Sequence, residues 1–208
     1  MDRQQARADI GQAVIHTHAT DGKAICIRTI RHSDEKRMRE GIARLSETSR
    51  YLRFFSAQPM PSDKVIEQLL DVDGSDHIAW GAIHMDGANS PAIGAVHAIR
   101  DENDPRIGEY SVAIVDDYHS IGIGRMLTTV LLINCAAQGI GTLNIQMLAE
   151  NRGAIQFIKS IGGEMDQWEA AVCNLTLDVR AALAAIAAKP PVEGITEIFA
   201  VLGSYIPR

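Results

Sequence analysis

Apolar and polar positions alternate along the middle of the chain in short runs that predict a β-sheet. The run 142–149 shows this best, because Leu143, Ile145 and Met147 all fall on one face. Between two of the apolar runs lies "MDGANSP", a turn-forming cluster that predicts a hairpin. Strands are expected at 24–30, 77–84, 92–100, 109–115, 142–149, 165–172 and 173–179.

Helical patterns separate many of these strands. Ser33 and Ser62 stand where N-caps belong, and Gly139 stands where a helix would end. Helices are expected at 33–45, 62–72, 124–138, 151–163 and 179–189. The order of the two kinds of element predicts a mixed α/β fold of the α+β kind, in which helices flank a mostly antiparallel central sheet.

The remaining segments carry weaker signals. Residues 1–22 show no clear period and predict a loose arm, and residues 46–56 predict a connector that runs from polar to aromatic. No element is predicted for the apolar tail that follows Pro190 and Pro191. We therefore expect an N-terminal arm at 1–22, one domain at 23–178, and a C-terminal helix and tail at 179–208.

Composition narrows the classes of partner. The 208 residues carry a formal net charge of -6, which argues against broad binding to nucleic acid or to an anionic membrane. No apolar run approaches the roughly 20 residues that span a bilayer, and the N-terminus is polar. Cys26, Cys135 and Cys173 are widely spaced, which favours buried thiols in a reducing compartment over disulfides or a zinc site. We expect a cytoplasmic protein without metal, membrane or nucleic-acid partners.

The stretch "VDDYHSIGIGRML" places Gly122 and Gly124 just before an apolar, helix-like run. Glycine inside a helix costs about 1 kcal/mol relative to alanine, but it is suited to places where the backbone approaches another group closely. The first N–H groups of a helix lack intrahelical partners and lie at the positive end of its dipole. The segment therefore predicts either a phosphate site or simply a tight turn from strand to helix. It is not a P-loop, because no Lys-Ser or Lys-Thr pair follows.

This stretch resembles the acyl-CoA pyrophosphate loop of the GCN5-related N-acetyltransferase (GNAT) family. It matches at Gly122 and Gly124 and departs at His119, where the family commonly has Gln or Arg. A second segment, "NRGAIQFIKSIGG", is similar to a family segment further along the chain. That similarity is carried by Asn151, Ala154, Phe157 and Gly162. The order of elements from Ala24 to about Leu177 fits the GNAT fold as well.

The resemblance implies acetyl-CoA as co-substrate and a set of residues that hold it. That set is Ile114, Val115, His119, Ser120, Ile121, Gly122, Ile123, Gly124, Arg125 and Asn151. Two positions depart from the family pattern. Many members have a tyrosine, the general acid for the leaving thiolate, at the position of Ile158, and a phenylalanine at the position of Gly163. Another group or water must then protonate the thiolate.

A narrower resemblance covers "IRTIRHSDEKRMREGIARLSETSRYLRFFS", which is similar to the start of the acetyltransferase domain of bacterial Pat-type protein lysine acetyltransferases. Its signature here is Leu45, Ser46, Ser49, Arg53 and Phe54. The resemblance implies that Glu109 is the general base. Judged from the residues alone, Glu109 is either a base whose pKa burial would raise or a solvated glutamate at the start of a strand.

Other polar residues invite two interpretations each. Arg50 and Arg53 stand near aromatic residues and are expected either to line an acceptor channel or to pack at the surface. His77, His84 and His97 lie on predicted strands without metal-ligand spacing, so hydrogen-bonded structural roles are favoured. Asn151 is suited to bind the pantetheine arm, to cap its helix, or both.

The function that the resemblance implies is transfer of an acetyl group from acetyl-CoA to a primary amine by direct attack. A protein lysine is the leading acceptor, and a small-molecule amine is the alternative. A non-catalytic acyl-CoA-binding regulatory module also stays open, favoured by Ile158 and Gly163. We expect a monomer or a homodimer.

Overall fold

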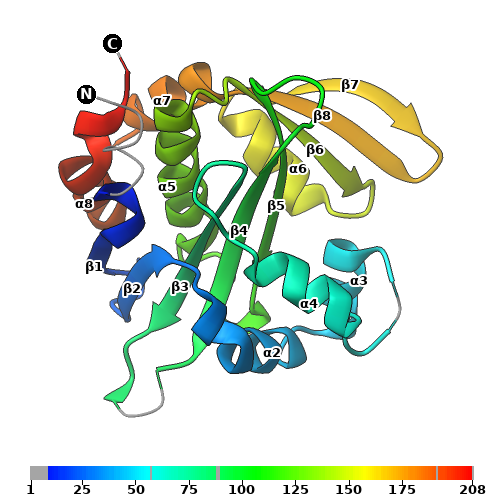
Figure 1. Ribbon diagram of the computed structural model, residues 1–208, viewed down its shortest axis with the longest axis horizontal. Coiled ribbons are helices and arrows are strands. Elements are labelled where there is room, and N and C mark those ends of the chain that lie inside the picture. The colour runs from blue at the N-terminus through cyan, green and yellow to red at the C-terminus, as the bar shows by residue number, and fades with distance from the viewer. Residues whose placement is uncertain (1–8, 57, 88–89, 191, 208) are drawn as a thin grey trace.

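A single eight-stranded sheet organises the computed structural model, which describes residues 9–56, 58–87, 90–190 and 192–207 (Figure 1). The strand order is β1-β2-β3-β4-β5-β6-β8-β7, and every neighbouring pair is antiparallel except β5 and β6, which are parallel. This confirms the expected mixed α/β fold with a mostly antiparallel sheet. The strands are β1 (Val14–His18), β2 (Ala24–Thr29), β3 (His77–His84), β4 (Ala92–Arg100), β5 (Ile107–Ile114), β6 (Thr142–Leu148), β7 (Glu164–Glu169) and β8 (Val172–Asp178).

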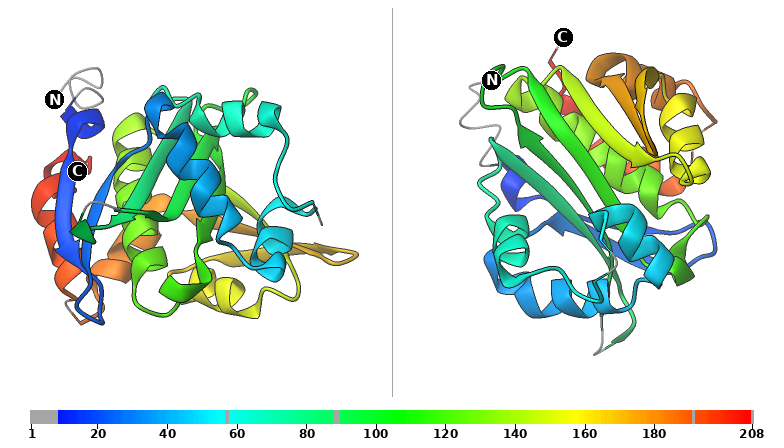
Figure 2. Two further views of the ribbon diagram at one scale, coloured as in Figure 1. Left: turned by 90° about the horizontal axis from the view of Figure 1, so that it is seen from below. Right: turned by 90° about the vertical axis from the view of Figure 1, so that its right-hand side faces the viewer.

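Helices cover both faces of the sheet (Figure 2). The long helix α5 (Ile123–Gln138) packs on one face against β3, β4 and β5, and α7 (Val179–Ala187) and α8 (Glu193–Leu202) pack beside it. Nearly every residue of α5 is buried, in agreement with its mostly apolar sequence. The other face carries α2 (Glu35–Ala43), α3 (Glu47–Phe54) and α4 (Asp63–Leu70), as Figure 2 shows in its left-hand view. Helix α6 (Arg152–Ser160) adds Ile155 and Ile158 to the same core as α5.

The loose arm predicted for residues 1–22 is wrong where the structure describes it. Strand β1 pairs along its whole length with β2, and Ile15 and Thr17 point into the protein while their neighbours are exposed. Because one of the two inward positions is a threonine, the alternation was too weak to identify in the sequence. Residues 1–8 of the predicted arm lie outside the described residues.

The connector predicted for residues 46–56 is also wrong, because most of it forms α3. Ser46 caps this helix and accepts a hydrogen bond from the Ser49 N–H at 3.1 Å. The N-cap predicted at Ser33 is replaced by a short 3-10 turn before α2. There the Asp34 carboxylate accepts the Arg31 N–H and pairs with Arg28.

The C-terminal tail, for which no element was predicted, forms α8 and a final 3-10 turn (Gly203–Tyr205). Ile195, Ile198 and Leu202 of α8 join the main core beside α5. The division into arm, domain and tail stays a prediction, although β1 and α8 both pack on the sheet domain. All three cysteines are free and buried, as expected. Among the described helices, none has both the length and the apolar character needed to cross a bilayer.

Two histidines, His77 on β3 and His97 on β4, form a buried pair. The Nδ1 of His77 lies 2.9 Å from the Asp71 carbonyl, which accepts only, so His77 is protonated at Nδ1. Its Nε2 then accepts the proton of His97 Nδ1 at 3.0 Å. Burial lowers the pKa of both imidazoles below the ordinary value, and Arg53 lowers the pKa of His97 further. The pair is therefore neutral in the folded protein, and the structural role predicted for these residues is confirmed.

This pair makes stability depend on pH. Below pH about 6.5 the unfolded chain binds more protons at these histidines than the folded protein does, so the free energy of unfolding falls as pH falls. Each site contributes a slope of up to about 1.4 kcal/mol per pH unit. Urea unfolding of wild type and His97→Gln at pH 7, 6 and 5 tests this. We expect a shallower decline for the variant, and parallel curves for the two proteins would contradict the assignment.

Candidate active site

The parallel strands β5 and β6 separate halfway along their length. Their backbones pair from Ile107 and Thr142 to Tyr110 and Ile145, and no further. Beyond that point β5 stays paired with β4, and β6 stays paired with β8. The edge of β5 that faces β6 is left without a ladder partner from Ser111 onward, so backbone N–H and C=O groups there are available to another molecule.

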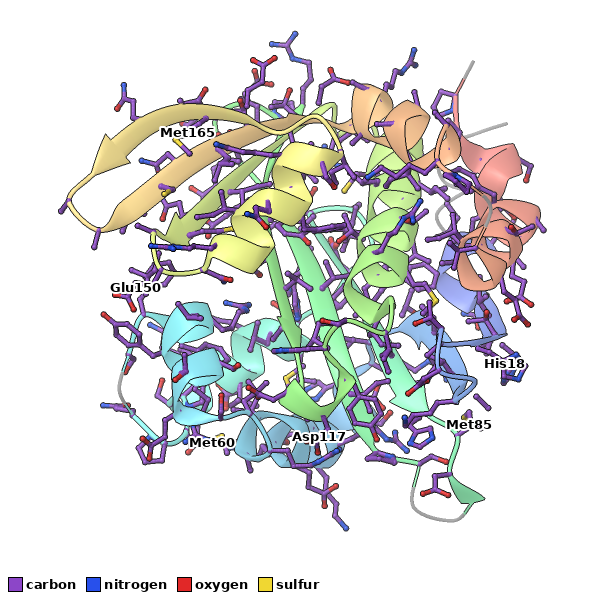
Figure 3. All side chains as sticks on the ribbon, turned by 180° about the vertical axis from the view of Figure 1, so that it is seen from behind. His18, Met60, Met85, Asp117, Glu150 and Met165 are labelled. Atoms are coloured by element: carbon purple, nitrogen blue, oxygen red, sulfur yellow. The ribbon has the colours of Figure 1, made fainter. Side chains whose placement is uncertain are left out.

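A cleft of about 490 Å³ lies where the strands separate. Helix α3 forms one wall, α6 forms another, and the loop between β5 and α5 closes one end. Figure 3 shows α6 above α3 in this region, with Glu150 labelled at the turn before α6 and Asp117 labelled in the loop after β5. The polar lining residues are Ser49, Arg53, Tyr110, Tyr118, His119, Ser120, Arg125 and Asn151.

Asp116, just after β5, fixes the position of α3. Its carboxylate accepts hydrogen bonds from the Ser46 N–H at 2.9 Å, the Ser46 hydroxyl at 2.6 Å and the Ser49 hydroxyl at 2.8 Å. Burial opposes ionisation of Asp116, but these hydrogen bonds outweigh it and hold its pKa at about 2. Asp116 was not predicted from the sequence. The one available signal is that two serines at the start of a helix need an acceptor outside it.

The loop before α5 presents its backbone to the cleft. Ser120 and Gly122 both have left-handed backbone conformations, with φ of 63° and 90°, and Gly122 is the N-cap of α5. The N–H groups of the first helical turn thus lie at the wall of the cleft without intrahelical partners. A Cβ at Gly124 would meet nothing nearer than a side-chain carbon of Ile114 at 3.9 Å, so this position is open toward the cleft.

Two side chains add to this end of the cleft. Arg125 donates from Nη2 to the Ile186 carbonyl at 3.4 Å, while its buried Nε has no hydrogen-bond partner among the described residues. Arg125 also lines this end of the cleft, and a cationic side chain beside open backbone amides fits an anionic group such as a pyrophosphate. His119 instead donates from Nε2 to the Ile114 carbonyl at 2.9 Å and ties the loop to the end of β5.

The predicted cofactor residues divide into two groups. Ile114, His119, Ser120, Gly122, Gly124, Arg125 and Asn151 line the cleft. Val115, Ile121 and Ile123 do not: Val115 is buried and lines a separate small cavity beside α2, and Ile123 is fully buried in the core. The Ile121 carbonyl accepts the Thr20 N–H at 3.1 Å. For Ile121 and Ile123 the prediction concerned backbone N–H groups, and it stays a prediction.

Asn151 caps α6, because its Oδ1 accepts the Ala154 N–H at 3.3 Å. The side-chain NH₂ group remains as a donor beside the cleft. Ile158 is fully buried and does not line the cleft. A Cβ at Gly163 would lie 2.4 Å from the Ile158 side chain and 2.9 Å from the Ile158 carbonyl oxygen, so this position has no room for a side chain.

Glu109 is exposed, so of the two alternatives left open by the sequence the structure fits the solvated glutamate near the start of a strand. It lies where two smaller cavities meet, one of about 80 Å³ beside Arg53 and one of about 270 Å³ beside the β4–β5 turn. The first of these shares Arg53, Tyr110 and Asn151 with the main cleft. Glu109 is thus reached from solvent on one side and from the cleft on the other.

The two arginines considered in the sequence differ in placement. Arg53 lines the main cleft and donates from Nη2 to the Ser111 hydroxyl at 2.8 Å. Arg50 donates to the Leu45 carbonyl at 2.6 Å and lines neither the cleft nor the cavities beside Glu109. Within the described part of the chain, no three His, Cys, Asp or Glu side chains are grouped so as to hold a metal ion.

The chain is similar to known acetyltransferases. It is 25% identical over 158 residues to acetyltransferase Pat of Mycolicibacterium smegmatis, covering 76% of this chain and 46% of that protein. It is 29% identical over 144 residues to acetyltransferase PA5475 of Pseudomonas aeruginosa, covering 68% of this chain and 76% of that protein. The chain thus spans about half of the first relative's length. No model of a known protein family matches it.

Among solved structures, the GNAT domain of Streptomyces lividans PAT aligns with a TM-score of 0.72 at 20% identity, covering 79% of this chain and 96% of that one. The chain therefore has the GNAT fold. The resemblance to Pat-type acetyltransferases that the motifs indicated is confirmed.

The open position at Gly124 gives a test of the cleft as an anion site. Gly124→Glu places a carboxylate beside the N-terminus of α5, where repulsion opposes a pyrophosphate, and the available space lets the fold survive. We expect acetyl-CoA affinity to fall at least about tenfold, or ~1.4 kcal/mol, by calorimetry. Gly124→Gln introduces a side chain of equal size without the charge. It is the control and should lose less affinity for acetyl-CoA. Unchanged affinity in both variants would remove this loop from the binding site.

Proposed function

We propose that this chain transfers an acetyl group from acetyl-CoA to a primary amine, most readily the side chain of a protein lysine. The observation that carries the proposal is the cleft at the separation of β5 and β6. One end of the cleft is lined by free helix amides and Arg125, and the other leads to Glu109. The likeness to curated acetyltransferases supports the reaction class.

In this proposal the pyrophosphate of acetyl-CoA occupies the loop end, on the backbone amides of about 121–125. The pantetheine arm runs along the unpaired edge of β5 toward Tyr110, where its amides replace the missing strand partner. Asn151 donates to the arm from the other wall. The acetyl group then lies where the main cleft joins the cavity that contains Glu109.

The acceptor approaches from the side of Glu109. A lysine ammonium has a reference pKa near ~10.4, so it must lose a proton before it attacks the thioester carbonyl. The Glu109 carboxylate takes that proton, directly or through a water, and passes it to solvent. Because Glu109 is exposed, proton exchange with solvent is direct. Ile158 supplies no acid, so the leaving thiolate takes its proton from water.

The surroundings of Glu109 support a protein acceptor over a small amine. Phe55 is 45% exposed and Ile99 is 46% exposed, and each lines one of the two cavities that meet at Glu109. Exposed Asp101 and Glu102 line the same cavity as Ile99, which is the one beside the β4–β5 turn. Large apolar side chains beside carboxylates suit a basic segment that is bound on both sides of its lysine.

Replacing these apolar side chains tests the acceptor class. Phe55→Asn keeps the left-handed conformation of residue 55, and Ile99→Thr keeps a β-branched residue in the strand. In the double variant we expect the KM for a protein acceptor to rise about fivefold, from a loss of ~1 kcal/mol of contact. Transfer to free lysine should be unchanged. Val201→Thr, at a similarly exposed residue on α8, is the matched control. An equal loss with both acceptors would instead favour the small-amine alternative.

The role of Glu109 separates an enzyme from a binding module. Glu109→Gln keeps the size and hydrogen bonding of the side chain but removes its basicity. General-base help is worth about 10²- to 10⁴-fold in rate, so kcat should fall by that factor while acetyl-CoA affinity stays constant. Raising the pH should restore part of the rate, because more of the amine is then deprotonated in solution. A pH–rate profile of both proteins is the measurement.

Equal rates for the two proteins across pH would remove Glu109 from the mechanism. Binding of acetyl-CoA without transfer by wild type to any amine would support the regulatory module.

A further inference from the structure

Arg53 occupies the point where the cleft and the cavity of Glu109 join. It lies in the last turn of α3, lines both spaces, and donates from Nη2 to Ser111 on β5 at 2.8 Å. A guanidinium has five N–H donors in a fixed plane, and Ser111 takes one of them. The fork is thus fixed at one corner and lies beside the position where the proposed function puts the thioester.

The surroundings of Arg53 strengthen the electrostatic interactions of its positive charge. Burial lowers the pKa of Arg53 to about 10, and attraction to Glu109 opposes this, so the side chain remains a cation at neutral pH. The neutral His97 lies on the strand position that pairs with Ser111 and brings no counter-charge. The guanidinium also stacks near Phe54, with its carbon 5.0 Å from the ring centroid. Charges in such partly desolvated surroundings act more strongly than in water.

The position of Arg53 is fixed from two directions. Asp116 holds the first turn of α3 through Ser46 and Ser49, and Ser111 holds the guanidinium at the other end of the helix. A donor held in place before the reaction does not have to reorganise when charge develops, and this is the condition under which electrostatic stabilisation is most effective.

We propose that Arg53 is a catalytic residue whose guanidinium donates a hydrogen bond to the thioester carbonyl oxygen of acetyl-CoA. The inference rests on the proposed function. As the amine nitrogen bonds to the carbonyl carbon, the C=O electron pair moves to oxygen, and Arg53 stabilises that negative charge. When the C=O bond re-forms, the C–S bond breaks and sulfur leaves as thiolate. The amine proton goes to Glu109, and the thiolate is protonated by water.

The kinetic test compares variants on one helix. Removing one donor from an oxyanion site costs about 10²- to 10³-fold in kcat, so we expect that loss for Arg53→Gln with little change in the KM for acetyl-CoA. Arg53→Lys keeps the positive charge but not the planar set of N–H donors, so its kcat should fall less than that of Arg53→Gln. Arg50→Gln removes the same charge three residues earlier, outside these cavities, and is the matched control for folding and net charge. Equal losses in Arg50→Gln and Arg53→Gln would overturn the proposal.

A spectroscopic test needs no acceptor. Isotope-edited infrared spectra of bound acetyl-CoA, labelled with ¹³C at the thioester carbonyl, report hydrogen bonding to that oxygen. We expect a lower stretching frequency on wild type and Arg50→Gln than in solution, and a return toward the solution value on Arg53→Gln. An unshifted band on wild type, or the same shift on wild type and Arg53→Gln, would overturn the proposal even if acetyl transfer occurs. A shift that depends on Arg53 without transfer to any amine would refute the proposed function and leave the contact standing.

Discussion

The separation of β5 from β6 is the constraint on which the rest of the site depends. Past Tyr110 and Ile145, each strand keeps only its antiparallel neighbour, so the sheet continues as two halves that share one parallel junction. The core on the α5 face continues across this junction, and so the split does not divide the protein. The split leaves an extended backbone edge at the floor of a cleft, which suits a linear ligand that carries amides of its own.

The residues of the Pat-like signature hold α3 in its position. Ser46 and Ser49 hold Asp116, Leu45 is buried just before α3, and Arg53 donates to Ser111. These contacts join α3 to Ser111, within β5, and to Asp116, just after that strand. A substitution in this set would therefore change the cleft even where the residue touches no ligand. Motif residues that look catalytic in a sequence can act by fixing the wall against which the reacting groups lie.

Features that local conformation decides could be predicted from the sequence, whereas features that depend on contacts between distant segments could not. Gly139 ends α5 as expected, because local conformation alone decides that position. The hairpin of β3 and β4 followed from its turn residues. By contrast, α3 and β1 were missed, since their apolar faces are short and tertiary packing decides them. Asp116 was missed for the same reason: its serine partners are about 70 residues away in sequence. The sequence left open whether Glu109 is buried or exposed, because alternation fixes a face of the strand but not what covers that face.

Gly163 packs directly against Ile158, which is buried at the position where the family resemblance implies a tyrosine as general acid. The Gly163 N–H donates to the Ile158 carbonyl at 2.9 Å, and only a residue without a side chain fits against Ile158 there. An aromatic hydroxyl at 158 would thus have to enter a packed core, not an open cleft. A thiolate is a good enough leaving group to depart unprotonated if the charge of the preceding intermediate is controlled. In the proposed mechanism the catalytic demand therefore falls on the amine proton and the carbonyl oxygen, the two groups assigned to Glu109 and Arg53.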